Sequence, residues 1–166
     1  MTGATQVPVQ DPTRQLLRHI VATLAYRASK ALRDVPAEFA NFAASPHTRT
    51  PVRILAHMGD LADWALSIAS GKQTWQNSTP LPWPQEVERF FASLAALDAY
   101  LASDQPLHGD IGRLFQGGLA DALTHTGQIA MLRGMAGCPM RGENYYVAKI
   151  EAGRVGPEQA APVREF

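Results

Sequence analysis

Residues 119–132 read L-A-D-A-L-T-H-T-G-Q-I-A-M-L, and we expect the chain to be organised around this stretch. Its apolar residues recur at steps of three and four, which predicts an amphipathic helix. Asp121 and His125 stand four residues apart, so a carboxylate and an imidazole share one helix face between apolar neighbours. Ionisable groups on a buried face need a partner or a metal ion. We therefore expect the rest of the chain to bring a third ligand to this pair.

The composition favours a single globular domain spanning residues 1–166. Of the 166 residues, 46% are hydrophobic and 18% are charged, enough apolar material for a substantial core. Residues 1–10 are expected to be a loose lead-in, and residues 140–166, rich in glycine and proline, an irregular C-terminal tail. The formal net charge is zero and the basic residues are scattered, which argues against a nucleic-acid partner.

The cysteine content and the hydropathy pattern favour a cytoplasmic protein with no membrane span. The chain has one cysteine, Cys138, so no internal disulfide can form, and a reducing compartment is the default. No apolar run approaches the ~18 residues of a membrane-spanning helix. The N-terminal sequence lacks the basic start and apolar stretch of a secretory signal.

Start and stop signals predict four helices, and hence an all-α, four-helix bundle. Helices are expected to open at Asp11-Pro12, at Thr50-Pro51 and at Pro84, and a fourth to run from about Asp110 to Gly137. The third helix shows an apolar face on which we expect no inward histidine or carboxylate. The short connection 105–110 predicts that the third and fourth helices are antiparallel neighbours.

Two connecting features bear on how the helices are placed. Residues 71–83 show no helical period and span up to ~40 Å when extended, enough to run the length of a bundle. Gly117 and Gly118 lower the helix propensity of the fourth helix, and we expect them either to allow a close helix approach or to give the site room.

His57 is the expected third ligand. It lies between Ile54 and Leu61 on the apolar stripe of the second helix, so it faces the core. With Asp121 and His125 it forms a two-histidine, one-carboxylate set, which suits zinc, nickel, iron(II) or manganese and leaves positions open for water or substrate. The alternative is a buried Asp–His hydrogen bond that only stiffens the core.

Two further polar residues are candidates for the surroundings of this set. Gln128 lies one turn beyond His125 and is placed to hydrogen-bond a ligand. Asp60 lies three residues beyond His57, where it either hydrogen-bonds the imidazole or sits at the edge of the helix face.

The most recognisable parts of the chain are R-I-L-A-H-M-G-D-L-A-D-W around His57, A-D-A-L-T-H-T-G-Q-I-A-M-L-R around Asp121 and His125, and E-N-Y-Y-V-A-K-I in the tail. Together they resemble the DinB-like superfamily of bacterial four-helix bundles, over nearly the whole chain from about Thr13. The resemblance implies an up-down-down-up bundle in which the second and third helices run parallel.

The resemblance also implies a metal site. In that family a metal is typically held by three histidines, one on the second helix and an H-x-x-x-H pair on the fourth. His57 and His125 match ligand positions, whereas Asp121 stands where the pair has its first histidine. A carboxylate can ligate there, but it changes the charge and hardness of the site. Weakened or lost metal binding is the alternative that this departure leaves open.

Two classes of function follow. The first is a metal-dependent enzyme acting on a small molecule, a thiol S-transferase or a hydrolase, since relatives of known chemistry use low-molecular-weight thiols. Asn144 and Tyr145 are then candidates for contacts to the metal ligands or for the pocket wall. The second is a non-catalytic binding or dimerising bundle with a relic or structural His/Asp cluster. Family habit and spare aromatic surface suggest a homodimer. An iron-dependent oxygenase is suggested by ligand type alone.

Overall fold

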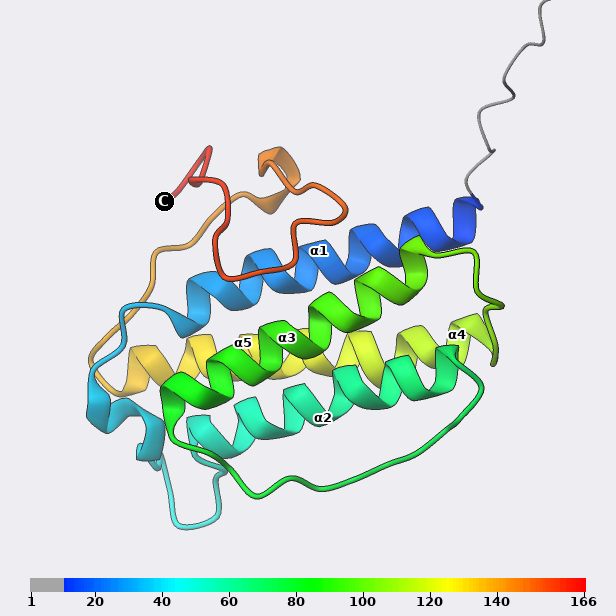
Figure 1. Ribbon diagram of the computed structural model, residues 1–166. Coiled ribbons are helices and arrows are strands. Elements are labelled where there is room, and N and C mark those ends of the chain that lie inside the picture. The colour runs from blue at the N-terminus through cyan, green and yellow to red at the C-terminus, as the bar shows by residue number, and fades with distance from the viewer. Residues whose placement is uncertain (1–10) are drawn as a thin grey trace, which may run out of the picture.

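The computed structural model describes residues 11–166 as an all-helical chain (Figure 1). The all-α class and the four main helices are therefore confirmed, while the expected lead-in 1–10 lies outside the described residues. The elements are α1 (Pro12–Leu32), the short turn η1 (Ala37–Asn41), α2 (Pro51–Ala69), α3 (Trp83–Ala102), α4 (Ile111–Leu114), the π-helical turn η2 (Phe115–Leu119), α5 (Ala120–Met135) and the short turn η3 (Tyr145–Val147).

The helix boundaries follow local chemistry. The Asp11 side chain accepts a hydrogen bond from the Thr13 amide at 2.9 Å and caps α1, with Pro12 in the first turn. Proline likewise opens α2 after Thr50. Just beyond the end of α2, Gly71 has φ of 77°, a left-handed conformation that costs glycine little. The predicted starts are thus correct to within a residue or two.

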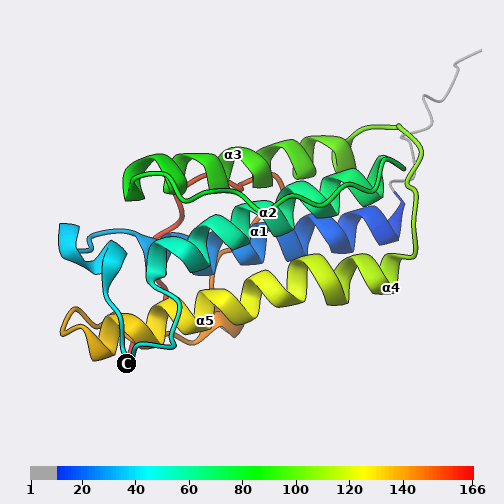
Figure 2. The same ribbon diagram turned by 90° about the horizontal axis from the view of Figure 1, so that it is seen from below.

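Around the bundle, the packed neighbours are α1 with α3, α3 with α2, α2 with α5, and α5 with α1. α3 and α5 therefore lie diagonally, on opposite sides of the molecule in Figure 2. The expectation that the third and fourth helices are neighbours is wrong. The physical reason is the path of the connection after α3: the His108 amide donates to the Ala69 carbonyl at 2.9 Å, so the chain crosses the C-terminal end of α2 before it turns into α4.

The segment 71–82 runs back alongside the bundle, so α2 and α3 point in the same direction (Figure 1). Its middle is attached to α2: the amide and hydroxyl of Ser78 donate to the Asp60 carboxylate at 2.9 and 2.6 Å. Nearer its start, the Thr74 amide donates to the Ser67 hydroxyl at 3.0 Å. The long connection is thus held against α2 by side chains of α2.

The expectation that α3 presents no inward carboxylate is wrong. Glu86 is fully buried and Asp98 is 6% exposed. Each is paired with an arginine: Arg89 Nε lies 3.0 Å from Glu86, and Arg18 binds both oxygens of Asp98 at 2.9 and 3.0 Å. A carboxylate can be buried in this way because its charge is compensated.

The tail packs on α1 as an irregular segment. Lys30 of α1 contacts Glu143 at 3.1 Å and Glu165 at 2.7 Å. Burial alone would lower the pKa of Lys30, but the hydrogen bonds to Glu165 and Glu143 outweigh it and raise the pKa. Tyr26 donates to Glu143 at 2.6 Å, and its pKa is raised by burial and then by that bond.

Among residues 11–166 no helix is long and apolar enough to cross a membrane.

Candidate metal centre

His57 of α2 and the pair Asp121 and His125 of α5 meet between the two helices, as predicted. Asp121 lies between the imidazoles: one carboxylate oxygen is 3.6 Å from His57 Nε2 and the other is 3.5 Å from His125 Nε2. The two rings stand nearly perpendicular, with centroids 4.9 Å apart. One donor atom from each residue lies within 4.8 Å of the others. Because these three residues could hold a metal ion, we refer to them as the metal centre, a candidate site.

These separations are close to those of metal ligands. A tetrahedral ion with ligand bonds of ~2.0–2.2 Å holds its ligand atoms ~3.3–3.6 Å apart. The 3.5 and 3.6 Å contacts of Asp121 are near this spacing and run from its two different carboxylate oxygens, while one donor atom from each of the three residues lies within 4.8 Å of the others. The donor set of two imidazole nitrogens and a carboxylate oxygen also fits a divalent transition metal. The residues present thus fit the group that the sequence predicts.

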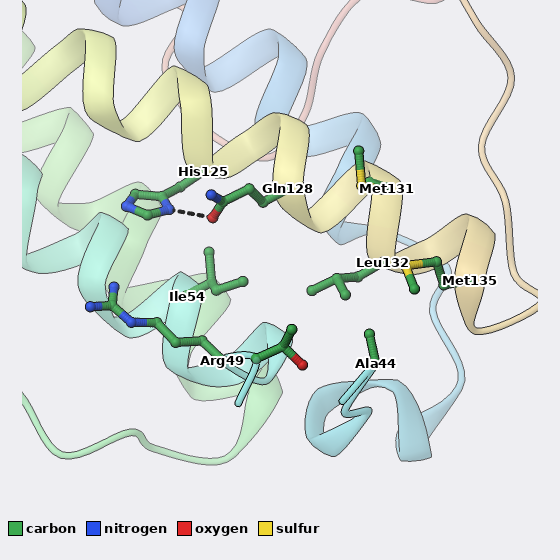
Figure 3. Close-up of a pocket in the computed structure, with 9 residues that line it drawn as sticks. Ala44, Arg49, Ile54, His125, Gln128, Met131, Leu132 and Met135 are labelled. Carbon is green, nitrogen blue, oxygen red and sulfur yellow. Dashed lines mark hydrogen bonds between the residues drawn. The ribbon is translucent and has the colours of Figure 1, made fainter. Parts of the chain in front are cut away.

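Gln128 orients His125, as expected. His125 Nδ1 lies 2.7 Å from Gln128 Oε1, a carbonyl oxygen that can only accept (Figure 3). Nδ1 therefore carries the proton in the neutral ring, and Nε2 presents its lone pair toward Asp121. A lone pair that faces a carboxylate at 3.5 Å is favourable only with a cation between them, either a proton on the ring or a metal ion.

His57 is biased toward its neutral form. Burial is the largest cause that lowers its pKa, followed by the positive charges of His125 and Arg49, while Asp121 acts in the opposite direction. The neutral imidazole is the form that ligates metals. On its outer side His57 meets Trp75 edge-on at 5.6 Å, and Trp75 packs on Trp64 in the same manner.

Two glycines let the helices approach at the metal centre. A Cβ atom on Gly118 would lie 3.0 Å from Ala65 Cβ, and one on Gly117 would lie 3.0 Å from the Trp64 ring. Both glycines lie in the π-helical turn η2, just before Asp121. The expected close approach is thus confirmed, and the π turn that accompanies it was not predicted from the sequence.

The metal centre is open on one side. The side chain of His125 is 11% exposed and that of His57 23%, whereas that of Asp121 is 43% exposed. A site with three protein ligands and an exposed edge leaves room for water or a substrate, which is the arrangement of catalytic rather than structural metal sites.

A cavity of about 430 Å³ begins at His125 and Gln128 (Figure 3). Its lining comes from α5, from the start of α2 and from the loop before α2. The remaining lining residues are Ala44, Thr48, Arg49, Ile54, Met131, Leu132 and Met135. Sequence reasoning missed this cavity, although Met131 and Leu132 end the helical pattern of residues 119–132 and Met135 continues it by one turn.

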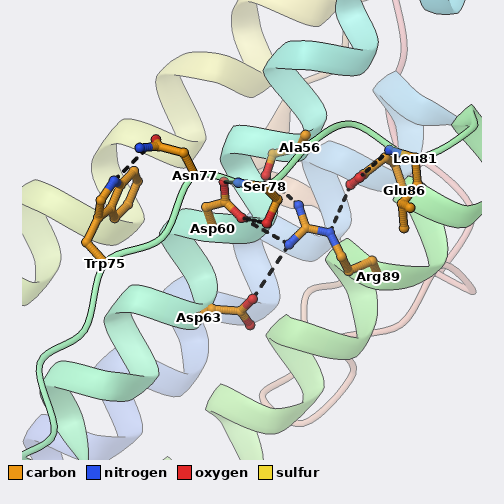
Figure 4. Close-up of polar contacts among 9 residues, drawn as sticks. All are labelled: Ala56, Asp60, Asp63, Trp75, Asn77, Ser78, Leu81, Glu86 and Arg89. Carbon is orange, nitrogen blue, oxygen red and sulfur yellow. Dashed lines mark hydrogen bonds and ion pairs between the residues drawn. The ribbon is translucent and has the colours of Figure 1, made fainter.

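Asp60 does not contact the His57 ring, contrary to one of the two positions expected for it. Its oxygens accept hydrogen bonds from Ser78 and pair with Arg89 at 3.1 Å, toward α3 (Figure 4). Arg89 also binds Glu86, contacts Asp63 at 3.6 Å and donates to the Ala56 carbonyl. We call these side chains of Asp60, Asp63, Ser78, Glu86 and Arg89 the Arg89 cluster.

Asn144 and Tyr145 lie away from the cavity, which corrects their expected place in its wall. Asn144 caps η3 by accepting from the Tyr146 amide at 3.1 Å. Tyr145 packs edge-on against Tyr26 and beneath the guanidinium of Arg27, both on α1. The tail is held on α1, whereas the metal centre lies between α2 and α5, so these residues belong to the attachment of the tail.

Comparisons with family models, with curated proteins and with solved structures give no match for this chain.

Proposed function

We propose that this chain is a DinB-like, metal-dependent enzyme that acts on a small molecule, of the thiol S-transferase or hydrolase type. One observation carries the proposal: donor atoms from His57, Asp121 and His125 converge from two helices, and one of these residues, His125, also lines a cavity. A pocket that adjoins ionisable groups of this kind is the usual setting of an active site.

The parts of the site have separate roles in this proposal. His57, Asp121 and His125 would hold the ion, and Gln128 fixes the ring of His125. A bound divalent metal lowers the pKa of a water or thiol ligand and polarises an acceptor group on the substrate. Because Asp121 supplies the only negative charge among the three ligands, a divalent ion leaves the centre with one net positive charge, which favours an anionic nucleophile.

The arrangement of the helices supports the family assignment within this proposal. α2 and α3 point the same way and are joined by the long segment 71–82 (Figure 1). This is the feature that an up-down-down-up bundle requires and that an up-down-up-down bundle lacks.

Metal content tests the proposal. Protein purified without chelator or a metal-binding tag should carry about one equivalent of a transition metal by elemental analysis, and His57→Ala should lose it. His19→Ala, on the exposed side of α1, is the matched control and should retain the metal. Equal metal content in all three proteins, or metal in none after reconstitution, contradicts the proposal.

A non-catalytic bundle is the second candidate. The observation that favours it is that Asp121 lies within 3.6 Å of both imidazoles, so that a protonated histidine alone would compensate its charge. A purely structural cluster leaves the melting temperature unchanged on addition of chelator, whereas a metal centre loses the stabilisation that binding provides.

A further inference from the structure

The cavity beside the metal centre has a polar end and an apolar end. Figure 3 shows His125 and Gln128 on one wall and the Arg49 guanidinium on the facing wall, all toward the same end. Arg49 also acts electrostatically on His57, which places its charge near the metal centre. At the other end, Leu132 and Met135 of α5 face Ala44 across the cavity.

The charge of the polar end is positive. Arg49 is the only arginine or lysine among the lining residues, and none of them is acidic. Within residues 11–166 no ion pair or hydrogen bond joins Arg49 to another side chain, so its guanidinium keeps its donors for a ligand. A guanidinium suits a carboxylate or a similar oxyanion, which it can bind with two parallel hydrogen bonds.

The apolar end of the cavity can accommodate hydrocarbon groups of different shapes. Met131 and Met135 are 69% and 57% exposed, unusually open for methionine, while Leu132 forms a buried wall between them. Methionine side chains adapt to ligands of different shape. A cavity of about 430 Å³ falls within the ~300–1,000 Å³ range of small-molecule sites.

We propose that this cavity binds a small amphiphilic anion, with its oxyanion on Arg49 beside the metal centre and its alkyl or aryl body between Leu132, Met135 and Ala44. This inference rests on the proposed function, because it specifies the substrate class of the same site. It explains why a cation and an exposed apolar surface meet at one opening of the molecule.

Methionine methyl resonances give a direct test. The probes are phenylpropionate and its neutral amide, titrated into the full chain with and without chelator. We expect the methyl signals of Met131 and Met135 to move, while that of Met58, fully buried in the core, stays fixed as an internal control. The carboxylate should bind up to about 5-fold more tightly than the amide, the range of a partly exposed ion pair.

Two variants assign the contacts. Arg49→Gln should reduce the affinity for phenylpropionate to that of the amide and leave the amide unaffected. Ala44→Phe, which fills the apolar end, should abolish binding of both probes. The inference is overturned if neither probe moves the methyl signals of Met131 or Met135, with or without chelator. It is also overturned if the Arg49→Gln variant binds phenylpropionate as tightly as the unaltered chain.

A metal titration of the same samples separates this inference from the proposed function. Probe binding in the presence of chelator, with no metal taken up after its removal, would support the cavity assignment and refute the metal-dependent enzyme. Metal uptake with no probe binding would refute the cavity assignment and support the metal-dependent enzyme.

Discussion

The metal centre and the Arg89 cluster both place carboxylates of this bundle beside cationic or basic side chains, yet they differ in how completely those groups are satisfied. In the Arg89 cluster, Glu86 is fully buried and Asp60 is 4% exposed, and each has both a backbone amide and a guanidinium as partners. In the metal centre, Asp121 is 43% exposed and faces two imidazoles at 3.5 and 3.6 Å. The carboxylates of the first arrangement are satisfied within the protein, whereas that of the second is partly exposed to solvent.

Burial with complete pairing is typical of a structural ionic cluster, whereas converging donors with an open edge are typical of a binding site. The Arg89 cluster ties three elements together: α2, α3 and the segment 71–82 (Figure 4). It also fixes the segment that carries Trp75, which packs on His57. The closed cluster therefore supports one wall of the open site.

The largest effect is expected from breaking the closed cluster. Arg89→Met leaves the carboxylates of Asp60 and Glu86 buried without their cation, and we expect a loss of about 3–5 kcal/mol in the free energy of unfolding. Urea denaturation measures it. Arg53→Met, on the exposed face of α2, is the control and should stay within about 0.5 kcal/mol. An Arg89→Met protein as stable as the control would show that the cluster is not structural.

The open site should instead respond to metal. At a free Zn²⁺ concentration about 100 times its dissociation constant, the folded chain should gain about 2.7 kcal/mol, reversed by chelator. Asp121→Asn should lose this gain while its metal-free stability changes by less than about 1 kcal/mol, because the Asp121 side chain is partly exposed. Thermal unfolding with and without Zn²⁺ measures both quantities. A gain that survives in Asp121→Asn would remove Asp121 from the ligand set.

Gln128 should act on the metal only through His125. Gln128→Ala frees the His125 ring from its 2.7 Å bond, and loss of such an outer partner weakens metal affinity by about 10- to 100-fold. Competition against a chromophoric chelator gives the affinity. Thr124→Ala, on the exposed side of α5, should leave it unchanged. Equal affinities in the two variants would contradict the role assigned to Gln128.

The smallest effect is expected in the tail, a partly exposed counterpart of the Arg89 cluster. The hydrogen bond that Lys30 donates lowers the pKa of Glu165 below its ordinary value of 4.5. Glu165 therefore stabilises the fold above pH 4.5. This contribution is lost as the pH falls through the pKa of Glu165 in the folded state. The stability difference between the unaltered chain and Glu165→Gln should therefore shrink below pH 4.5. Glu151→Gln, in an exposed part of the tail, should show no such trend.

Sequence patterns predicted those features that local chemistry determines. Asp11-Pro12 and Thr50-Pro51 open helices because capping and proline act within one turn. The face shared by Asp121 and His125 follows from helical spacing alone, and the place of His57 follows from the apolar stripe of its helix. Because these signals are local, they place the three donors without knowledge of the tertiary structure.

Features that depend on distant partners were missed. Asp98 is buried because Arg18, 80 residues away, reaches it from α1, and no local signal announces that pairing. Tyr145 was misplaced because the tail is fixed by bonds from Lys30 to Glu143 and Glu165, across 113 and 135 residues. Arg49 reaches the cavity from an irregular loop, where periodicity gives no guidance on direction.

The ring nitrogen resonances of the five histidines report whether His57 and His125 ligate a metal together with Asp121. The remaining three, His19, His47 and His108, are exposed and serve as internal controls. One equivalent of Zn²⁺ should shift the Nε2 signals of His57 and His125 alone, and in Asp121→Asn this response should be weakened. Shifts spread equally over the exposed histidines, or none at His57 and His125, would contradict the account.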